Sequence, residues 1–224
     1  MSMDRIDLHK RRMEVQKIGD DFVVDNIIDD ILNTFRSNPS YTTIVHLGET
    51  REVHIIDDND RRQVGGRKIL LSKPKDVEVE VGDFVELNGK IWLCTQKDTD
   101  NKIQSRTTIE RTNKAIKLES GSQKLVKGYD SMDRPIYDEI KVYNETRTVA
   151  STRLQLGISG QDDEPIKLPE GRLSLCIPYK DKHGVHIDGE FEVDGENYII
   201  KDIDFTNVID GNGIINFIAH RRQK

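Results

Sequence analysis

The stretch "VELNGKIWL" at Val85–Leu93 returns 106 positions later (191 minus 85) as "FEVDGENYI" at Phe191–Ile199. In both copies two apolar residues flank a glutamate before Asn-Gly or Asp-Gly, and an aromatic residue follows three positions after the glycine. These dipeptides tolerate positive φ at both central positions of a type I′ turn, the tightest link between antiparallel strands. The repeat therefore predicts two β-hairpins, turning at Asn88-Gly89 and Asp194-Gly195, in two related β-modules.

Three aromatic residues of the repeat are expected in the core. Trp92 and Tyr198 occupy the same place in the exit strand of each copy, and Phe191 opens the second entry strand. Such side chains can stack on bases or sugars, but a position in an apolar-patterned strand favours core packing. We therefore interpret Trp92, Tyr198 and Phe191 as structural.

Apolar residues alternate with polar ones through most of the chain beyond Tyr41, for example in "VEVEV" at Val77–Val81, which predicts a strand. About a dozen short strands separated by turn signals are typical of sandwiches or barrels. We predict a mainly β protein in which an N-terminal helix precedes two β-sandwich or barrel-like modules that contain the related hairpins. The predicted divisions are a helical arm at 1–40, a first β-module at 41–118, a linker or loop at 119–135 and a second β-module at 136–224.

One segment has helical periodicity. Its apolar residues recur at the spacing that places one stripe on a helix, which predicts a packing face made of Val24, Ile27, Ile28, Ile31, Leu32 and Phe35. Asp20 or Asp21 can cap the start of this helix. Pro39 ends it, because a proline disfavours helical geometry at the preceding residue.

Composition narrows the class of protein. The formal charge is 34 minus 40, or −6, which disfavours extensive wrapping of nucleic acid, since phosphate binding depends on clustered Lys and Arg. No apolar run approaches the roughly 20 residues of a bilayer span, and the first residues lack the apolar core of a signal peptide. We expect a protein made in the cytoplasm without export. Cys94 and Cys176 lie in strand-like runs and are expected to be packed thiols without a disulfide.

No recognised catalytic, cofactor or metal motif is present in the sequence. His183 and His186 could ligate a metal with Cys176, but the further ligands at a known spacing are missing. Asp98–Asn101 and Asp57–Asp60 resemble fragments of a calcium loop, and turn chemistry explains both more simply. We predict no catalytic, cofactor-binding or metal-binding residues, although residues distant in sequence can still meet in a fold.

The segment Val77–Leu118 resembles neck proteins of tailed bacteriophages, in which "GDxVExNGxxWLVxxxDxDN" precedes a strand that ends in an Asn-x-x-(Leu or Ile)-Lys motif. The matching residues here are Gly82, Asp83, Val85, Glu86, Asn88, Gly89, Trp92, Leu93, Asp98, Asp100 and Asn101, followed by Asn113–Lys117. The second half of that family shows "IxxGxxFxIDGxxYxIxxxD" after an apolar strand and a proline. This chain offers Ile177-Pro178, Ile187-Asp188-Gly189, Phe191, Val193, Asp194-Gly195, Tyr198 and Asp204.

The resemblance implies a non-enzymatic virion protein, a ring-forming head–tail connector or head-closure subunit that joins portal to tail around the DNA channel. Its implied partners are further copies of itself, the portal or adaptor and tail proteins, and DNA that passes without sequence-specific binding. We then expect the polar loops at Asp57–Gly66, Glu119–Pro135 and Gly157–Gly171 to be ordered by other subunits. The alternative is a β-rich binding module that recognises a sugar, a peptide or nucleic acid through a sheet face.

Overall fold

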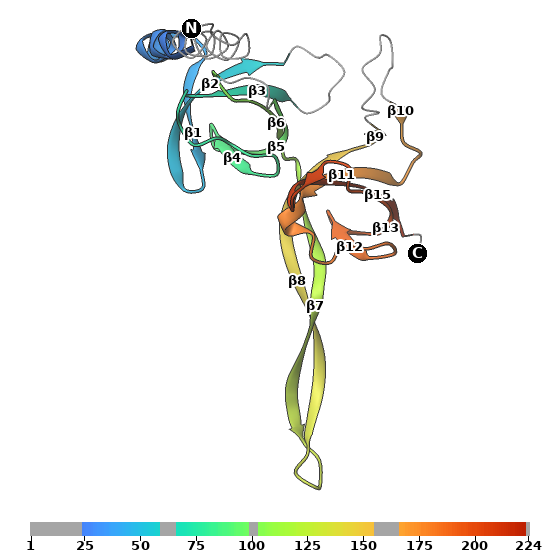
Figure 1. The fold of residues 1–224 in the computed structure, drawn as a ribbon. Helices are drawn as coiled ribbons and strands as arrows, with labels where there is room; N and C mark the ends of the chain where they lie inside the picture. The colour runs from blue at the N-terminus through green and yellow to red at the C-terminus, as the bar shows by residue number, and fades with distance from the viewer. Residues whose placement is uncertain (1–23, 59–65, 99–102, 155–165, 223–224) are drawn as a thin grey trace, which may run out of the picture.

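The computed structural model describes residues 24–58, 66–98, 103–154 and 166–222. A helix at 24–34 leads through a short 3₁₀ turn, η1 (Phe35–Ser37), into two β-barrels, and a long two-stranded ribbon projects from the second barrel (Figure 1). The prediction of a mainly β protein with an N-terminal helix and two barrel-like modules that contain related hairpins is confirmed.

The first barrel is closed and follows the order β1-β2-β3-β6-β5-β4. Its strands are β1 (Tyr41–His46), β2 (Glu49–Asp57), β3 (Arg67–Ser72), β4 (Phe84–Leu87), β5 (Lys90–Asp98) and β6 (Arg106–Arg111). Its core packs Ile44, Val53, Leu70, Val79, Val85, Leu87, Trp92, Cys94 and Ile109. Because closure leaves each strand paired on both sides, this barrel needs no partner to protect a long open edge.

The second barrel arises from the order β11-β8-β7-β12-β13-β15-β14, in which β11 also pairs with β15 and so closes six of the strands. The strands are β7 (Lys114–Tyr129), β8 (Pro135–Ser151), β11 (Arg172–Pro178), β12 (Glu190–Val193), β13 (Glu196–Asp204), β14 (Val208–Ile209) and β15 (Asn212–Arg221). A small sheet of β9 (Arg153–Leu154) and β10 (Ile166–Lys167) and a 3₁₀ turn, η2 (Tyr179–Asp181), complete it.

The two barrels have the same strand topology. In each, the first strand pairs with the second and fourth, the third pairs with the second and sixth, and the repeated hairpin supplies the fourth and fifth strands. Both hairpins have positive φ at the two turn residues, 54° and 69° at Asn88-Gly89 and 52° and 80° at Asp194-Gly195, as a type I′ turn requires. The sequence repeat therefore corresponds to a structural repeat.

Backbone hydrogen bonds match across the repeat. The amide of Gly82 donates to Cys94 O at 2.8 Å, and the amide of Asp188 donates to Ile200 O at 2.8 Å, each partner 106 positions later (188 minus 82; 200 minus 94). The bulge in the fifth strand also recurs, after Cys94 in one barrel and after Ile200 in the other. Shared irregularities of this kind favour duplication of one module over convergence on a common hairpin.

The segment Glu119–Pro135 corrects the predicted domain divisions. It was expected to be a linker or loop, but it forms the outer part of β7, a tight tip and the start of β8. The passage between the barrels lies instead at Thr112-Asn113, so β7 belongs to the second module. Ser, Gly and Asp residues suggested a loop, whereas pairing with β8 within the same chain makes the segment a strand.

The segment Val77–Val81 also differs from its prediction. It forms no ladder and runs into a turn at Val81, and only Val79 is buried, while Val77 is 53% exposed. Alternation alone does not make a strand, because a neighbouring strand must be available to accept the hydrogen bonds. The chain here passes over the barrel and inserts a single side chain.

Candidate assembly interface

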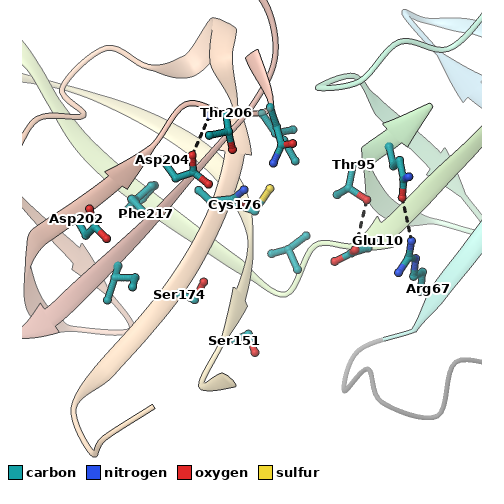
Figure 2. Close-up of a pocket in the computed structure, with 16 residues that line it drawn as sticks. Arg67, Thr95, Glu110, Ser151, Ser174, Cys176, Asp202, Asp204, Thr206 and Phe217 are labelled. Carbon is teal, nitrogen blue, oxygen red and sulfur yellow. Dashed lines mark hydrogen bonds between the residues drawn. The ribbon is translucent and has the colours of Figure 1, made fainter. Parts of the chain in front are cut away.

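A polar cleft of about 750 Å³ lies between the two barrels (Figure 2). The first barrel contributes Arg67, Thr95, Gln96 and Glu110, and the lining from the second barrel includes Ser151, Ser174, Cys176, Asp202, Asp204 and Phe217. The hydroxyl of Thr95 donates to Glu110 Oε1 at 3.3 Å. Burial raises the pKa of Glu110, although the charge of Arg67 and this hydrogen bond act in the opposite direction.

The described residues that line the cleft bring together neither an activated nucleophile nor a group of metal ligands. Burial raises the pKa of the Cys176 thiol, so this side chain is protonated and weakly nucleophilic at neutral pH. Asp204 accepts a hydrogen bond from the backbone amide of Thr206 at 2.8 Å, which is a turn-forming role. Within the part of the chain that the structure describes, no group of three or more His, Cys, Asp and Glu residues could hold a metal ion.

The barrels meet closely beside the cleft. The Asp83 carboxylate of the first barrel accepts a hydrogen bond from His46 Nε2 at 3.0 Å. It also pairs with Nζ of Lys180, a residue of the second barrel, at 3.3 Å. A Cβ atom added to Gly82 would lie 2.3 Å from the carbonyl oxygen of Gly213, closer than real side chains approach backbone. Glycine at this position therefore permits the two barrels to pack backbone against backbone.

The projecting ribbon, residues Glu119–Tyr143, is named the arm below. Its strands pair from Glu119 opposite Tyr143 to Tyr129 opposite Pro135, with bulges after Glu119 and after Val126. Beyond Leu118, where β7 leaves its pairing with β12, each arm strand has only the other as a ladder partner. A two-stranded ribbon is at best marginally stable in water, so this element needs additional burial to hold a fixed shape.

The tip of the arm is well formed. The Asp130 carboxylate accepts the backbone amides of Met132 and Arg134 at 2.8 and 2.9 Å, and it pairs with the Arg134 side chain. The backbone bonds from Arg134 and Met132 hold the pKa of Asp130 below its usual range. A stable turn at the tip fixes the register of the two arm strands.

The arm has two apolar faces. Directly paired residues of antiparallel strands share a face, and successive residues alternate between faces. The aliphatic face presents Leu125, Ile136, Ile140 and Val142, and the tyrosine face presents Val126, Tyr129, Tyr137 and Tyr143. Seven of these eight side chains are about half exposed or more, and Val142 is half-buried. This is the pattern of an interaction element, because large contiguous apolar surface is rare on a free monomer.

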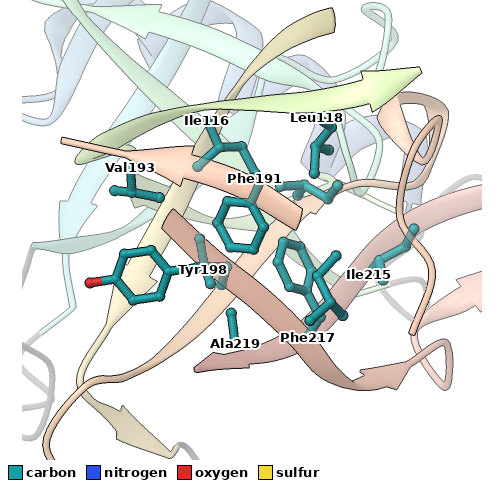
Figure 3. Packing of buried hydrophobic residues seen from close by; sticks show 11 residues of the cluster. Ile116, Leu118, Phe191, Val193, Tyr198, Ile215, Phe217 and Ala219 are labelled. Atoms are coloured by element: carbon teal, nitrogen blue, oxygen red, sulfur yellow. The ribbon is translucent and has the colours of Figure 1, made fainter. Parts of the chain in front are cut away.

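The predicted core aromatics are buried. Trp92 is 5% exposed in the first core and Tyr198 is 8% exposed in the second. Phe191 stacks on Tyr198 with ring centroids 5.9 Å apart and meets Phe217 edge to face at 5.8 Å (Figure 3). The aromatic rings of the repeat therefore face inward in both barrels, and neither hairpin offers an open stacking surface.

The residues of the predicted helix packing face differ in how deeply they are buried. Ile28 and Phe35 are buried, Val24, Ile31 and Leu32 are half-buried, and Ile27 is 39% exposed. Phe35 anchors this segment, since its ring stacks on His54 of β2 at 4.0 Å and its carbonyl lies 2.8 Å from His54 Nε2. The capping residues Asp20 and Asp21 lie outside the described residues.

The structure also describes the two cysteines, two of the histidines and one of the polar loops singled out in the sequence. Cys94 and Cys176 are free thiols. His183 and His186 are exposed, and His186 contacts the carbonyl of Gly184. The calcium-like fragments and the polar loops at Asp57–Gly66 and Gly157–Gly171 fall largely outside the described residues, whereas Glu119–Pro135 is ordered by pairing within its own chain.

The arm is the feature that the sequence reasoning missed. One signal was present in "PIYDEIKVY" at Pro135–Tyr143, where Ile136, Ile140 and Val142 fall on one face of a strand too long for a small barrel. Its partner strand carries a weaker pattern, with glycines at 121 and 128 near the bulges. The pairing between them follows from the tight turn at Asp130, which the sequence reasoning assigned to a linker.

The chain is similar in sequence to a known protein family and to a prophage-derived protein. Residues 95–220, more than half of the chain, match the model of the YomX C-terminal domain. A protein of Bacillus subtilis strain 168, the SPbeta prophage-derived protein YomX, is 24% identical over 168 residues, which cover 70% of this chain and 72% of that protein. No solved structure gives a significant match.

None of the helices within the described ranges is long and apolar enough to cross a membrane. The matched region runs from the middle of β5 to the end of β15, so it includes the last strands of the first barrel, the arm and nearly all of the second barrel. The chain belongs to the family of the YomX C-terminal domain.

Proposed function

We propose that this chain is a structural subunit of a tailed-phage particle, a ring-forming head–tail connector that joins portal to tail around the DNA channel. The single observation that carries the proposal is the arm, an ordered ribbon with two apolar faces and no covering element within the described chain. The similarity to a prophage-derived protein supports a phage-related role. The motifs shared with neck proteins support the more specific position at the neck.

The architecture suits a non-enzymatic role of this kind. Two closed barrels in close contact through Gly82 and Asp83 supply rigid bulk, and the arm extends well beyond them (Figure 1). The proposed partners are other copies of the chain and the portal or adaptor and tail proteins, with DNA passing through the channel. Net acidity is compatible with a conduit that does not retain the duplex, because retention depends on a track of Lys and Arg.

The alternative is a binding module that recognises a sugar, a peptide or nucleic acid through a sheet face. Stacking of a ligand on Trp92 or Tyr198 does not support it, because both side chains are buried. Half of the exposed large apolar side chains of the described chain lie on the arm, whose ribbon shape resembles an assembly element more than a ligand pocket.

The test is to purify particles of a phage or induced prophage that encodes this chain, identify their proteins by mass spectrometry and reconstruct the neck by electron microscopy. We expect the chain in mature particles, in a ring between the portal and the tail. Intact particles that lack the chain would contradict a virion role. A reconstruction that places it elsewhere in the particle would contradict the connector assignment.

A further inference from the structure

The arm concentrates the apolar surface of the molecule. Half of the large apolar residues that are exposed in the described chain lie on it, namely Leu125, Val126, Tyr129, Met132, Ile136, Tyr137, Ile140 and Tyr143. Met132 at the tip is 73% exposed and Tyr129 beside it is 65% exposed. Water opposes exposure of so much apolar surface, at about 25 cal/mol for each Å². The arm therefore has a strong thermodynamic preference for a covered state.

The arm has a net charge close to zero, so its charges do not favour a strongly charged partner. Its acidic residues outnumber its basic ones by one (five minus four). Three ion pairs form within it, Lys127 with Asp138, Arg134 with Asp130, and Lys141 with Glu119. A nucleic acid would require a surplus of basic side chains, which the arm lacks. The complementary surface is therefore apolar and close to neutral.

The length of the arm is close to the diameter of one barrel. Eleven residues from Glu119 to Tyr129 reach about 35 Å at roughly 3.3 Å per residue. A module of about 80 residues has a diameter of roughly 30 Å. The arm can therefore cross the full width of one barrel, and in Figure 1 it points away from both barrels of its own chain. A barrel that covers the arm would therefore belong to another molecule.

The surface area of the arm indicates how many neighbouring molecules are needed to cover it. A two-stranded ribbon about 10 Å wide presents roughly 350 Å² on each face, or about 700 Å² on both. A specific interface buries about 800 Å² for each partner. One face is too small for stable association, and the two faces together approach the requirement.

We propose that the arm of each copy lies between two further copies of the same chain, with its aliphatic face on one neighbour and its tyrosine face on the other. This proposal rests on the ring assembly proposed above and specifies its interface. Identical chains meet the requirement for two apolar neighbours, since both barrels also expose apolar side chains. These are Val45, Leu47, Ile56 and Val77 on the first barrel and Ile187, Phe205 and Ile209 on the second.

Four variants of the full chain test the proposal. One removes the aliphatic face (Leu125→Ser with Ile140→Ser) and one removes the tyrosine face (Tyr129→Ser with Tyr137→Ser). A matched control shortens polar side chains on both faces (Gln123→Ser with Lys124→Ser), at positions paired with Ile140 and Glu139. The fourth replaces residues 121–142 by Asn-Gly, which imitates a short hairpin like β1–β2.

The readout is molecular mass by light scattering over a range of concentrations, with circular dichroism and urea unfolding to verify folding. We expect the wild-type chain and the control to form the same oligomer. Each face variant should raise the concentration for half-dissociation by about tenfold or more, as loss of central apolar anchors does, and the shortened variant should be a folded monomer.

Three results would overturn the proposal. They are a wild-type chain that stays monomeric at high concentration, a shortened variant that assembles like the wild type, and a loss of assembly in one face variant only. The particle analysis described above separates the two proposals. A chain found at the neck whose shortened variant still assembles refutes the arm interface alone, whereas arm-dependent oligomers of a chain absent from particles refute the connector role alone.

Discussion

At the scale of single residues, Trp92 is predicted to be a core side chain and not a ligand contact. Truncation by Trp92→Ala should lower the free energy of unfolding by about 3–5 kcal/mol, the usual cost of removing a buried large aromatic. Urea unfolding measures this loss, and Trp92→Phe, which keeps a ring in the core, should cost much less. An equal loss in both variants would show that the site depends on something other than filled volume.

A second residue-scale prediction concerns Asp83, which joins the barrels. Burial acts to raise its pKa, but the hydrogen bond with His46, the backbone amide of Glu80 and the Lys180 ammonium together hold the pKa below its ordinary value. A depressed pKa stabilises the folded state at pH values above the ordinary aspartate pKa of about 3.9. This contribution disappears as the pH falls through the lower pKa of the folded state. Asp83→Asn should therefore be less stable than the wild type at pH 7, with the difference closing towards pH 3. Urea midpoints across this range test it, and a difference independent of pH would exclude a charge effect.

At the scale of elements, the two repeated hairpins should respond alike to the same substitution. Gly89 and Gly195 both have positive φ, 69° and 80°, and an added Cβ would meet nothing within 4 Å at either position. Alanine therefore costs only the strain of left-handed geometry, about 1–2 kcal/mol. We expect Gly89→Ala and Gly195→Ala to lower unfolding stability by similar amounts in urea titrations. A loss confined to one hairpin would show that the turns do not hold equivalent strands.

The hairpins were predictable from the sequence because their turn chemistry is local. Asn88-Gly89 and Asp194-Gly195 determine both the turn and the strands beside it, and the aromatic positions follow from alternation. The arm was not predicted, because its strands are defined by pairing with each other and Glu119–Pro135 has the composition of a loop. The prediction of a strand at Val77–Val81 was wrong for the opposite reason. The sequence there alternates as in a strand, but the described chain has no neighbouring strand that pairs with it.

At the scale of the whole molecule, net charge leads to a prediction about DNA. The chain carries a formal charge of −6, so we expect weak binding to duplex DNA, no tighter than the 10⁻⁴–10⁻⁶ M typical of non-specific contacts at physiological salt. A salt-dependent binding titration with the purified chain provides the measurement. Tight binding at low salt with a steep salt slope would contradict the connector role and favour a nucleic-acid-binding function.

The shared barrel topology has a consequence for how the molecule opens. In each barrel the ladder between the first and fourth strands is short, and in the first barrel it consists of Val45 opposite Glu86 and His46 opposite Val85. The corresponding ladder in the second barrel pairs only Leu118 and Lys117 of β7 with β12. These two seams should break first in local unfolding, so their amides should exchange hydrogen faster than those of the longer ladders. A seam that opens beside the arm exposes the edges of β7 and β12, and an identical strand from another molecule can pair with either edge. The second barrel therefore contains a route to strand exchange between molecules at the base of the arm.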